Sequence, residues 1–281
     1  MSTSSPLSVH LIDGTYELYR QFYGRKRFEK TGPAPLGAVA GVLHSILEMV
    51  EKGATHIGVA TDHVIESFRN DLWAGYKTGA GIERGLWAQF HPLEDALKAM
   101  GVAVWPMVEL EADDALASAA RLAAEDKKVQ QISIWTPDKD LAQCVRGDRV
   151  VQVLRKAKAI LDADGVRSKY GVVPERIPDF LALVGDTADG YPGITGIGRV
   201  GAARLVELHG AIEDFPADVL GDKRELALLF KDLATLRTDA KLFRSVEELR
   251  WRGPTDAFPA MAAKIADPKL LERAIRAAAT S

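Results

Sequence analysis

Nine carboxylate side chains gather in five short motifs of this sequence, and their spacing carries its clearest chemical signal. Three of the motifs directly follow an apolar run that is typical of a buried strand. The carboxyl ends of parallel strands meet at one crevice of an open α/β sheet, so acids that are distant in sequence converge there. The nine acids are Asp13, Asp62, Glu111, Asp113, Asp114, Asp138, Asp140, Asp186 and Asp189.

Each motif alone also has an ordinary structural explanation. Asp13 and Asp62 suit a turn after a strand, Asp138 suits the cap of a helix, and the acids at 111–114 suit a helix start, where the helix dipole favours negative charge. These separate explanations do not account for all five motifs together. Converging carboxylates without partners repel one another and raise one another's pKa, so a crevice lined by them requires a cation.

The donor types indicate which cation this is. No cluster of His and Cys accompanies the acids, which argues against zinc. Ligands that are all oxygen suit Mg²⁺ or Mn²⁺. Two such ions about 4 Å apart activate a water and stabilise the leaving oxygen of a phosphodiester. The acids therefore predict hydrolysis of a phosphate ester.

The elements that must position these acids alternate along the first part of the chain. We expect strands at 9–12, 56–60, 102–105, 131–135 and 150–154, with helices at 36–50 and 111–124. This alternation predicts an α/β fold with a mostly parallel sheet covered by helices on both faces. Strand runs then disappear and helices take over, with the clearest at 226–236 and 268–279. We place a boundary near Gly171, which divides the chain into 1–170 and 171–281.

Composition is that of a globular protein without a membrane segment. The net charge is −3, which argues mildly against binding nucleic acid by charge alone, although bound cations would cancel the acids locally. No apolar run reaches the length of about 18 residues that a membrane helix needs, and the N-terminus does not resemble a secretion signal. Cys144 is the only cysteine, so no internal disulfide is possible and a cytoplasmic location is expected.

A glycine-rich hairpin precedes a segment with helical character. Gly193, Gly196 and Gly198 permit a tight turn and close approach of another backbone, and the first N–H groups of the helix can face a phosphate. Arg199 and Arg204 follow and can add phosphate contacts. The pattern is the signature of a helix–hairpin–helix that binds DNA irrespective of sequence. A packing corner between two helices is the alternative.

A second unusual segment is 75–87, which is rich in glycine and lacks a core-forming period. It carries Lys77 and Arg84. It predicts either a mobile loop over the edge of the sheet or an ordinary surface loop.

These motifs together resemble the flap-endonuclease/5′-nuclease family. The chain is most similar to the 5′-3′ exonuclease domain of bacterial DNA polymerase I, and we expect it to be a stand-alone relative of that domain. The resemblance runs over 9–250. It implies a PIN-like sheet, a helical arch and a helix-three-turn-helix element. It rests on Leu11-Ile12-Asp13-Gly14, Ser67-Phe68-Arg69, Tyr76-Lys77, Glu111-Ala112-Asp113-Asp114, Thr136-Pro137-Asp138-Lys139-Asp140, Gly185-Asp186-Thr187-Ala188-Asp189, the hairpin 193–198 and Leu236-Arg237-Thr238-Asp239.

The resemblance assigns the acids to two ions. The first ion would be held by Asp13, Asp62, Glu111 and Asp113. The second would be held by Asp138, Asp140 and Asp189, with Asp113 shared and with Asp114 and Asp186 close by.

The resemblance also implies roles for the arch. Lys77 would contact the scissile phosphate and stabilise its developing charge. Tyr76 would stack on a terminal base, or else pack in the core of the arch. Arg69 belongs to the matched motif and is expected at the DNA. The family often has an arginine where this chain has Ala80, and Arg84 is the expected substitute. The family usually has asparagine where this chain has Gly190.

The expected function is a two-metal 5′-3′ exonuclease that also cuts 5′ flaps, acting in DNA replication or repair. Its catalytic residues would be Lys77 and Asp113, its ions Mg²⁺ or Mn²⁺, and K⁺ would bind at the hairpin. Its substrate would be DNA with free 5′ ends or flaps, bound by a monomer, with replication or repair proteins as further partners. The alternatives are a catalytically weak, structure-specific DNA-binding protein and a PIN-like RNase, against which the hairpin glycines speak.

Overall fold

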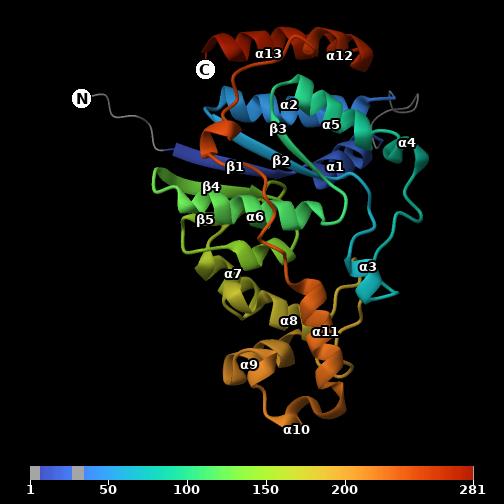
Figure 1. Cartoon of the computed structure of the whole chain (residues 1–281), viewed down its shortest axis with the longest axis vertical. Coiled ribbons are helices and arrows are strands. Elements are labelled where there is room, and N and C mark those ends of the chain that lie inside the picture. Colours follow the sequence, from blue (N-terminus) through green and yellow to red (C-terminus); the bar gives the residue numbers. More distant parts are fainter. Residues whose placement is uncertain (1–6, 27–34, 281) are drawn as a thin grey trace.

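A six-stranded sheet forms the centre of the upper half of the molecule (Figure 1). The computed structural model describes residues 7–26 and 35–280. The strand order is β3-β2-β1-β4-β5-β6, in which the first five strands are parallel and β6 is antiparallel. The strands are β1 (Leu7–Asp13), β2 (His56–Asp62), β3 (Ala103–Met107), β4 (Val129–Trp135), β5 (Val150–Leu154) and β6 (Ala159–Leu161).

Helices cover both faces of this sheet. Ile12 packs into the core on one face, and Leu11 packs into the core on the other, which explains why β1 is an unbroken apolar run. The first face carries α1 (Gly14–Lys26), α2 (Gly37–Glu51) and α5 (Phe90–Ala99), and the second carries α6 (Ala112–Glu125). The last helices, α12 (Phe258–Ile265) and α13 (Pro268–Thr280), return to the sheet half and pack on α2 (Figure 1).

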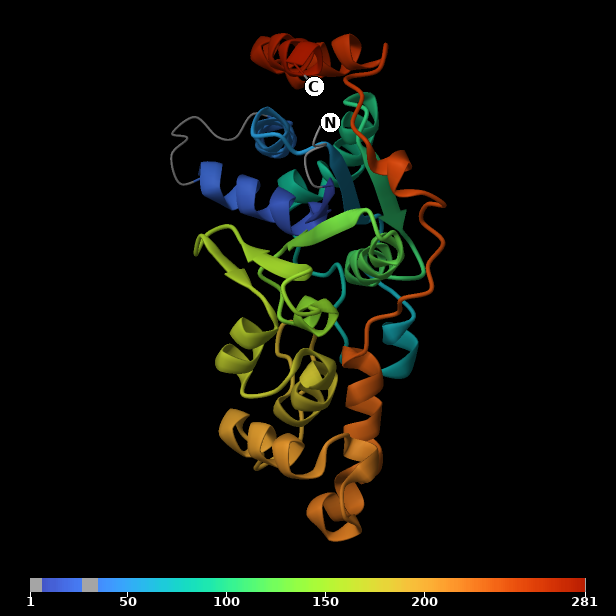
Figure 2. The same ribbon diagram turned by 90° about the vertical axis from the view of Figure 1, so that its left-hand side faces the viewer.

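A helical half lies below the sheet in Figure 2 and has its own hydrophobic core. Phe180 and Phe230 are among its fully buried side chains. Its helices are α7 (Ala163–Tyr170), α8 (Ile177–Val184), α9 (Arg199–His209), α10 (Ala217–Leu220) and α11 (Arg224–Ala234). Short 3-10 turns complete the chain: η1 (Asp140–Cys144), η2 (Pro174–Arg176), η3 (Ile212–Asp214), η4 (Gly221–Lys223) and η5 (Val246–Leu249).

The structure confirms the predicted α/β class and the mostly parallel sheet, and it adds elements that the sequence pattern did not indicate. These are α1, α5 and the antiparallel β6. Of the segment 75–87, which the resemblance implies as part of a helical arch, only the single turn 84–87 is helical. Residues 73–83 contain turns and bends, between the single-turn helices α3 (Arg69–Leu72) and α4 (Arg84–Trp87). Across 7–26 and 35–280, no helix is long and apolar enough to cross a membrane.

Candidate active site

The first acids meet where the direction of the sheet changes. Strand β1 lies between β2 and β4, so the chain runs outward to both sides from it, and such a switch point opens a crevice at the carboxyl ends of the strands. Asp13 ends β1 and Asp62 ends β2. Hydrogen bonds hold both. Asp13 accepts from Tyr16 N at 2.8 Å and from Thr136 Oγ1 at 2.9 Å, and Asp62 accepts from Ala112 N at 2.8 Å.

A second group of acids lies next to this crevice. Carboxylate oxygens of Asp140, Asp186 and Asp189 lie within 4.8 Å of one another. Asp140 begins η1, which follows β4 after a short loop, whereas the other two belong to the loop after α8. Among the described residues, the buried Asp140 Oδ1 has no hydrogen-bond partner. An all-carboxylate set with an unsatisfied buried oxygen fits a divalent cation that prefers oxygen ligands.

Two lysines provide built-in positive charge. Lys77 Nζ lies 2.9 Å from Glu111 Oε2 and 2.9 Å from Asp189 Oδ1, so it joins the two groups of acids. The Lys77 backbone N–H also donates to the Asp189 carbonyl at 3.0 Å. Lys139 forms an ion pair with Asp186. Two ammonium groups are fewer than the acids they face, so the site retains an excess of negative charge.

Burial makes these carboxylates difficult to ionise. It raises the pKa of Asp13 to about 7, and the neighbouring Asp62 and Asp138 raise it further. Burial also raises the pKa values of Asp113 and Asp140 well above the usual range, and in both cases Asp138 is the strongest contributing acid. Full ionisation of this group therefore requires compensating cations.

Arg69 lies elsewhere than expected, in a buried ion pair with Asp114. Both are fully buried, and the guanidinium makes two hydrogen bonds of 2.8 and 2.7 Å to the carboxylate. Arg69 also donates to the carbonyl of Leu233 at 2.8 Å, which ties α3 to α11. The expectation that Arg69 contacts DNA does not hold in this structure, because its side chain has no accessible surface. Asp114 is linked to the acids through this guanidinium, which also lies 3.4 Å from Glu111 Oε1.

Tyr76 is buried as well, with 4% of its surface exposed. Its hydroxyl lies 3.4 Å from Glu111 Oε2 and its ring joins the core of the helical half. The packing alternative therefore holds, and stacking on a terminal base does not fit this geometry. Arg84 is exposed on α4, as a residue at the DNA would be, while Ala80 lines a pocket with Asp62 and Lys77.

The structure explains why position 190 is a glycine. Its φ is +84°, and a Cβ at this position would lie 2.0 Å from the Gly75 carbonyl oxygen. Its own carbonyl accepts a hydrogen bond of 3.0 Å from Trp73 Nε1. The base of the 73–83 segment thus lies directly against the loop that carries Asp189, and no side chain fits between them.

The predicted hairpin joins α8 to α9. Gly193 has a φ of +70°, and a Cβ there would lie 2.3 Å from Gly185 N, so the two backbones need glycine to approach. Gly196, Gly198 and Arg204 are exposed, at the hairpin and on α9.

A pocket connects the hairpin helix to the acids. Its lining includes Asp13 and Asp138 on one side and Lys169 and Arg199 on the other. The guanidinium of Arg199 also lies over the rings of Tyr170 and Phe180. Arg199 was predicted from the sequence. Lys169 was not, and neither was Lys139, although it lies inside the motif 136–140. No local sequence pattern identifies these two lysines, because their role depends on the acids that they face in the folded chain.

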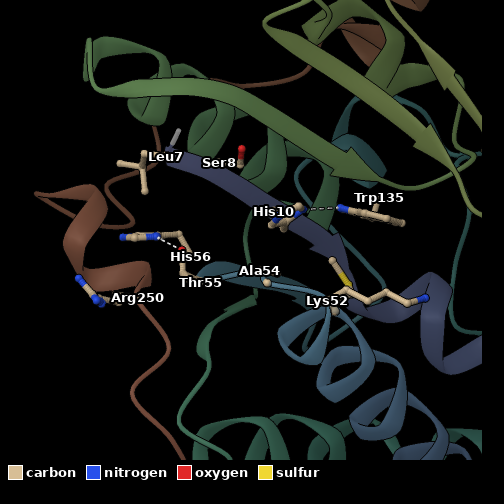
Figure 3. A pocket seen from close by; sticks show the side chains of 11 residues that line it. Leu7, Ser8, His10, Lys52, Ala54, Thr55, His56, Trp135 and Arg250 are labelled. Carbon is tan, nitrogen blue, oxygen red and sulfur yellow. Dashed lines mark hydrogen bonds between the residues drawn. The ribbon is translucent and has the colours of Figure 1, made fainter. Parts of the chain in front are cut away.

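A separate pocket lies at the amino ends of β1 and β2, on the opposite edge of the sheet (Figure 3). Trp135 Nε1 donates to His10 Nδ1 at 3.1 Å, and His56 Nδ1 is 2.9 Å from Thr55 Oγ1. Burial lowers the pKa of His10 to about 4, so the ring is neutral at pH 7. Within the described part of the chain, no carboxylate lines this pocket, so it offers no site of the same kind.

The carboxylate-lined switch point and the attached hairpin place the protein among the 5′-nucleases with a resolvase-like fold. Residues 8–171 match the family model described as 5'-3' exonuclease, N-terminal resolvase-like domain. Residues 172–257 match the model described as 5'-3' exonuclease, C-terminal SAM fold. The chain therefore belongs to the 5'-3' exonuclease family, as its motifs predicted.

Similar proteins include both short and long relatives. The chain is 34% identical over 259 residues to the DNA polymerase I of Pseudomonas aeruginosa, matching 85% of this chain but only 28% of that protein. It is 30% identical over 263 residues to a 5'-3' exonuclease of Buchnera aphidicola, matching 87% and 86% of the two chains. The bacteriophage T5 D15 flap endonuclease, in a pseudo-enzyme-product complex with DNA and metal ions, shares the fold, with a TM-score of 0.65, 18% identity and coverage of 95% and 100%.

Proposed function

We propose that this chain is a divalent-metal-dependent 5′-3′ exonuclease and 5′-flap endonuclease that hydrolyses DNA to products with a 5′-phosphate and a 3′-hydroxyl. One observation carries the proposal, namely that carboxylates from separate segments converge at the switch point with too few cations to balance them. The similar proteins support the substrate, since one is a 5'-3' exonuclease and another is held in complex with DNA and metal ions. DNA polymerase I as a relative supports a role in replication or repair.

We assign the acids to two ions, Mg²⁺ or Mn²⁺, by their donor type. The ions would activate the attacking water and stabilise the leaving oxygen. The first would be held by Asp13, Asp62, Glu111 and Asp113. The second would be held by Asp140, Asp186 and Asp189 with Asp138, and Asp186 is included here because its carboxylate lies within the cluster.

Lys77 has the position of a phosphate-binding residue. Its ammonium lies 2.9 Å from one carboxylate oxygen of each group of acids. A phosphate held between the two ions would therefore lie next to this ammonium. Both burial and its acidic neighbours act on it. Burial lowers the pKa of Lys77, but its neighbours together, led by Asp189 and Glu111, hold that pKa well above its ordinary value, so the ammonium keeps its charge. A fixed positive charge at this point stabilises the charge that develops on the phosphate.

Basic residues lead away from the acids toward the hairpin and form the proposed duplex track. Lys169 and Arg199 line the same pocket as Asp13, and Arg204 is exposed one turn further along α9. Contacts of this kind with phosphates position DNA without reading its sequence. We include K⁺ at the exposed hairpin glycines, tested by replacing K⁺ with Na⁺ in a duplex-binding assay. Arg84 would contact the 5′ strand from α4.

We also propose that the boundary between a catalytic domain, 1–170, and a DNA-binding region, 171–281, lies near Gly171. The separate core of the helical half supports it, and so does the junction of the two family models. The segment 251–280 contacts the sheet half through Trp251, Phe258 and Leu270.

The test is cleavage of matched flap, nicked and blunt DNA substrates, with mapped products, in Mg²⁺ and in Mn²⁺. We expect cuts near the flap junction and shortening from 5′ ends, and no cleavage in EDTA. Binding to flaps without turnover in either metal would instead establish a structure-specific DNA-binding protein. A parallel RNA substrate that is cut faster than DNA would establish an RNase.

A further inference from the structure

Tyr191 closes the loop that carries the second group of acids. It is 1% exposed, and its ring packs against Phe230 of α11, with centroids 5.5 Å apart. Its backbone pairs with Asp186 in both directions, at 2.8 and 3.0 Å. Packing and backbone together therefore fix where its hydroxyl points.

The Tyr191 hydroxyl is buried and, within the described residues, has no hydrogen-bond partner. Its surroundings are acidic. The carboxylates that act on it electrostatically are Asp140, Asp186, Asp189 and Asp138, in order of decreasing strength. A phenol hydroxyl is a hydrogen-bond donor to such acceptors.

Asp140 has an acceptor oxygen without a donor, just as Tyr191 has a donor without an acceptor. Asp140 Oδ1 is also buried and also without a hydrogen-bond partner, and Asp140 is the acid that acts most strongly on Tyr191. Two such groups that do not reach each other are satisfied by a single bridging water. A phenylalanine would fill the same space beside Phe230 without leaving a buried oxygen unsatisfied, so packing alone does not explain the hydroxyl.

Resting on the nuclease assignment, we propose that Tyr191 is a positioning residue of the cation site formed by Asp140, Asp186 and Asp189. Its hydroxyl donates to a water that also binds Asp140 Oδ1, and this contact holds the Asp140 carboxylate in the orientation that binds the cation. Groups that orient metal ligands in this way typically contribute 10- to 100-fold to metal affinity. Tyr76 offers a parallel on the other group of acids, since its hydroxyl lies 3.4 Å from Glu111 Oε2.

The test is a Mn²⁺ titration of the full chain without DNA, followed by electron paramagnetic resonance and calorimetry. We expect the wild-type protein to bind two ions and Tyr191→Phe to weaken one of them by about 10- to 100-fold. Tyr76→Phe is the matched control, and it should leave the affinity of that ion unchanged. Asp140→Asn should weaken the same ion, and Tyr191→Phe should add little in the Asp140→Asn background, because both changes break one contact.

Thermal unfolding separates positioning from simple packing. Positioning predicts that Tyr191→Phe reduces the rise in Tm on adding Mn²⁺ and leaves the metal-free Tm close to wild type. An equal fall of Tm with and without Mn²⁺, or two unchanged Mn²⁺ affinities, would overturn the role of Tyr191 and leave the nuclease assignment standing. A wild-type protein that binds fewer than two ions would overturn the two-ion assignment and, with it, this inference.

Discussion

Asp113 and Asp114 are neighbours in the first turn of α6, yet they face two different regions of the molecule. Asp114 lies between the sheet and the helical half, where Arg69 binds both of its oxygens and the backbone N–H groups of Glu111 and Arg237 donate to it at 3.0 and 2.8 Å. Asp113 faces the switch point, where Asp138 and Asp13 are among its neighbours. Two acids of one type, one residue apart, thus differ in their charge partners, since Asp114 has a guanidinium and Asp113 has mainly other acids.

The largest effect on stability is expected where the buried pair is complete. Arg69→Met leaves Asp114 buried without its partner, which typically costs about 3–5 kcal/mol of unfolding free energy. Urea unfolding measures this directly. The exposed Arg84 provides the matched control, since Arg84→Met should change the unfolding free energy by less than about 0.5 kcal/mol. Equal losses in the two variants would contradict the structural role of the pair.

Where the acids lack a positively charged partner, we expect their ionised form to destabilise the folded protein. Burial raises the folded-state pKa of Asp13 from 3.8 to about 7, so its contribution to stability is complete below pH 4 and is lost as the pH rises through 7. Metal-free protein should therefore lose a few kcal/mol, at most roughly 4, between pH 4 and pH 8 through this group. Saturating Mn²⁺ should remove the loss.

Asp13→Asn isolates that contribution. His10 titrates in the opposite sense, because burial lowers its pKa to about 4 and its contribution is lost as the pH falls from 6.5 toward 4. The difference between the variant and the wild type cancels His10 and every other unchanged group. Identical pH profiles for the two metal-free proteins would show that Asp13 is not held neutral by its surroundings.

The sequence predicted the sheet well because its central strands are continuous apolar runs that are buried on both faces. It missed β6, a short antiparallel strand of three residues, Ala159–Leu161, with no pattern of its own. It placed the acids correctly at the ends of β1 and β2 for the same reason, since a strand end can be read locally.

The errors concern contacts between distant segments. The pairing of Arg69 with Asp114 depends on α3 meeting α6 and α11, which no local pattern specifies. Asp186 was named among the metal residues but set behind Asp189, whereas its carboxylate lies with those of Asp140 and Asp189, in a loop where its backbone pairs with Tyr191. Such a pairing is known only once the loop is folded.

Lys77 is an intermediate case, because it forms ion pairs with two of these acids but its side chain is partly exposed. Lys77→Met removes two ion pairs, but the side chain is 30% exposed, so the loss of stability should be smaller than for Arg69→Met, about 1–2 kcal/mol. Mn²⁺ should bind more tightly, since the ammonium no longer competes for Glu111 and Asp189. Cleavage should fall by about 100-fold or more. Lys169→Met is the control, and a drop in Mn²⁺ affinity in Lys77→Met would contradict this account.

The smallest effect on stability is expected on the exposed duplex track. Arg204→Ala should leave the unfolding free energy unchanged within about 0.5 kcal/mol. It should weaken duplex binding and reduce the slope of log affinity against log salt by about 0.9, the value for one lost phosphate contact. Fluorescence anisotropy at several salt concentrations measures both quantities. Arg252→Ala, which removes an exposed arginine that is ion-paired with Glu247, should leave the slope unchanged. A duplex affinity and slope equal to wild type in Arg204→Ala would remove this residue from the track.

The contrast between the two neighbouring acids is tested most directly by Asp113→Asn on a 5′-flap substrate, with cleavage and binding measured in the same samples. We expect Mg²⁺-dependent cleavage to be lost, flap binding to be largely retained and the metal-free protein to be at least as stable as wild type, because the substitution removes a carboxyl group whose ionisation Asp138 and Asp13 oppose. Cleavage at the wild-type rate would contradict the claim that the converging carboxylates are the catalytic metal site.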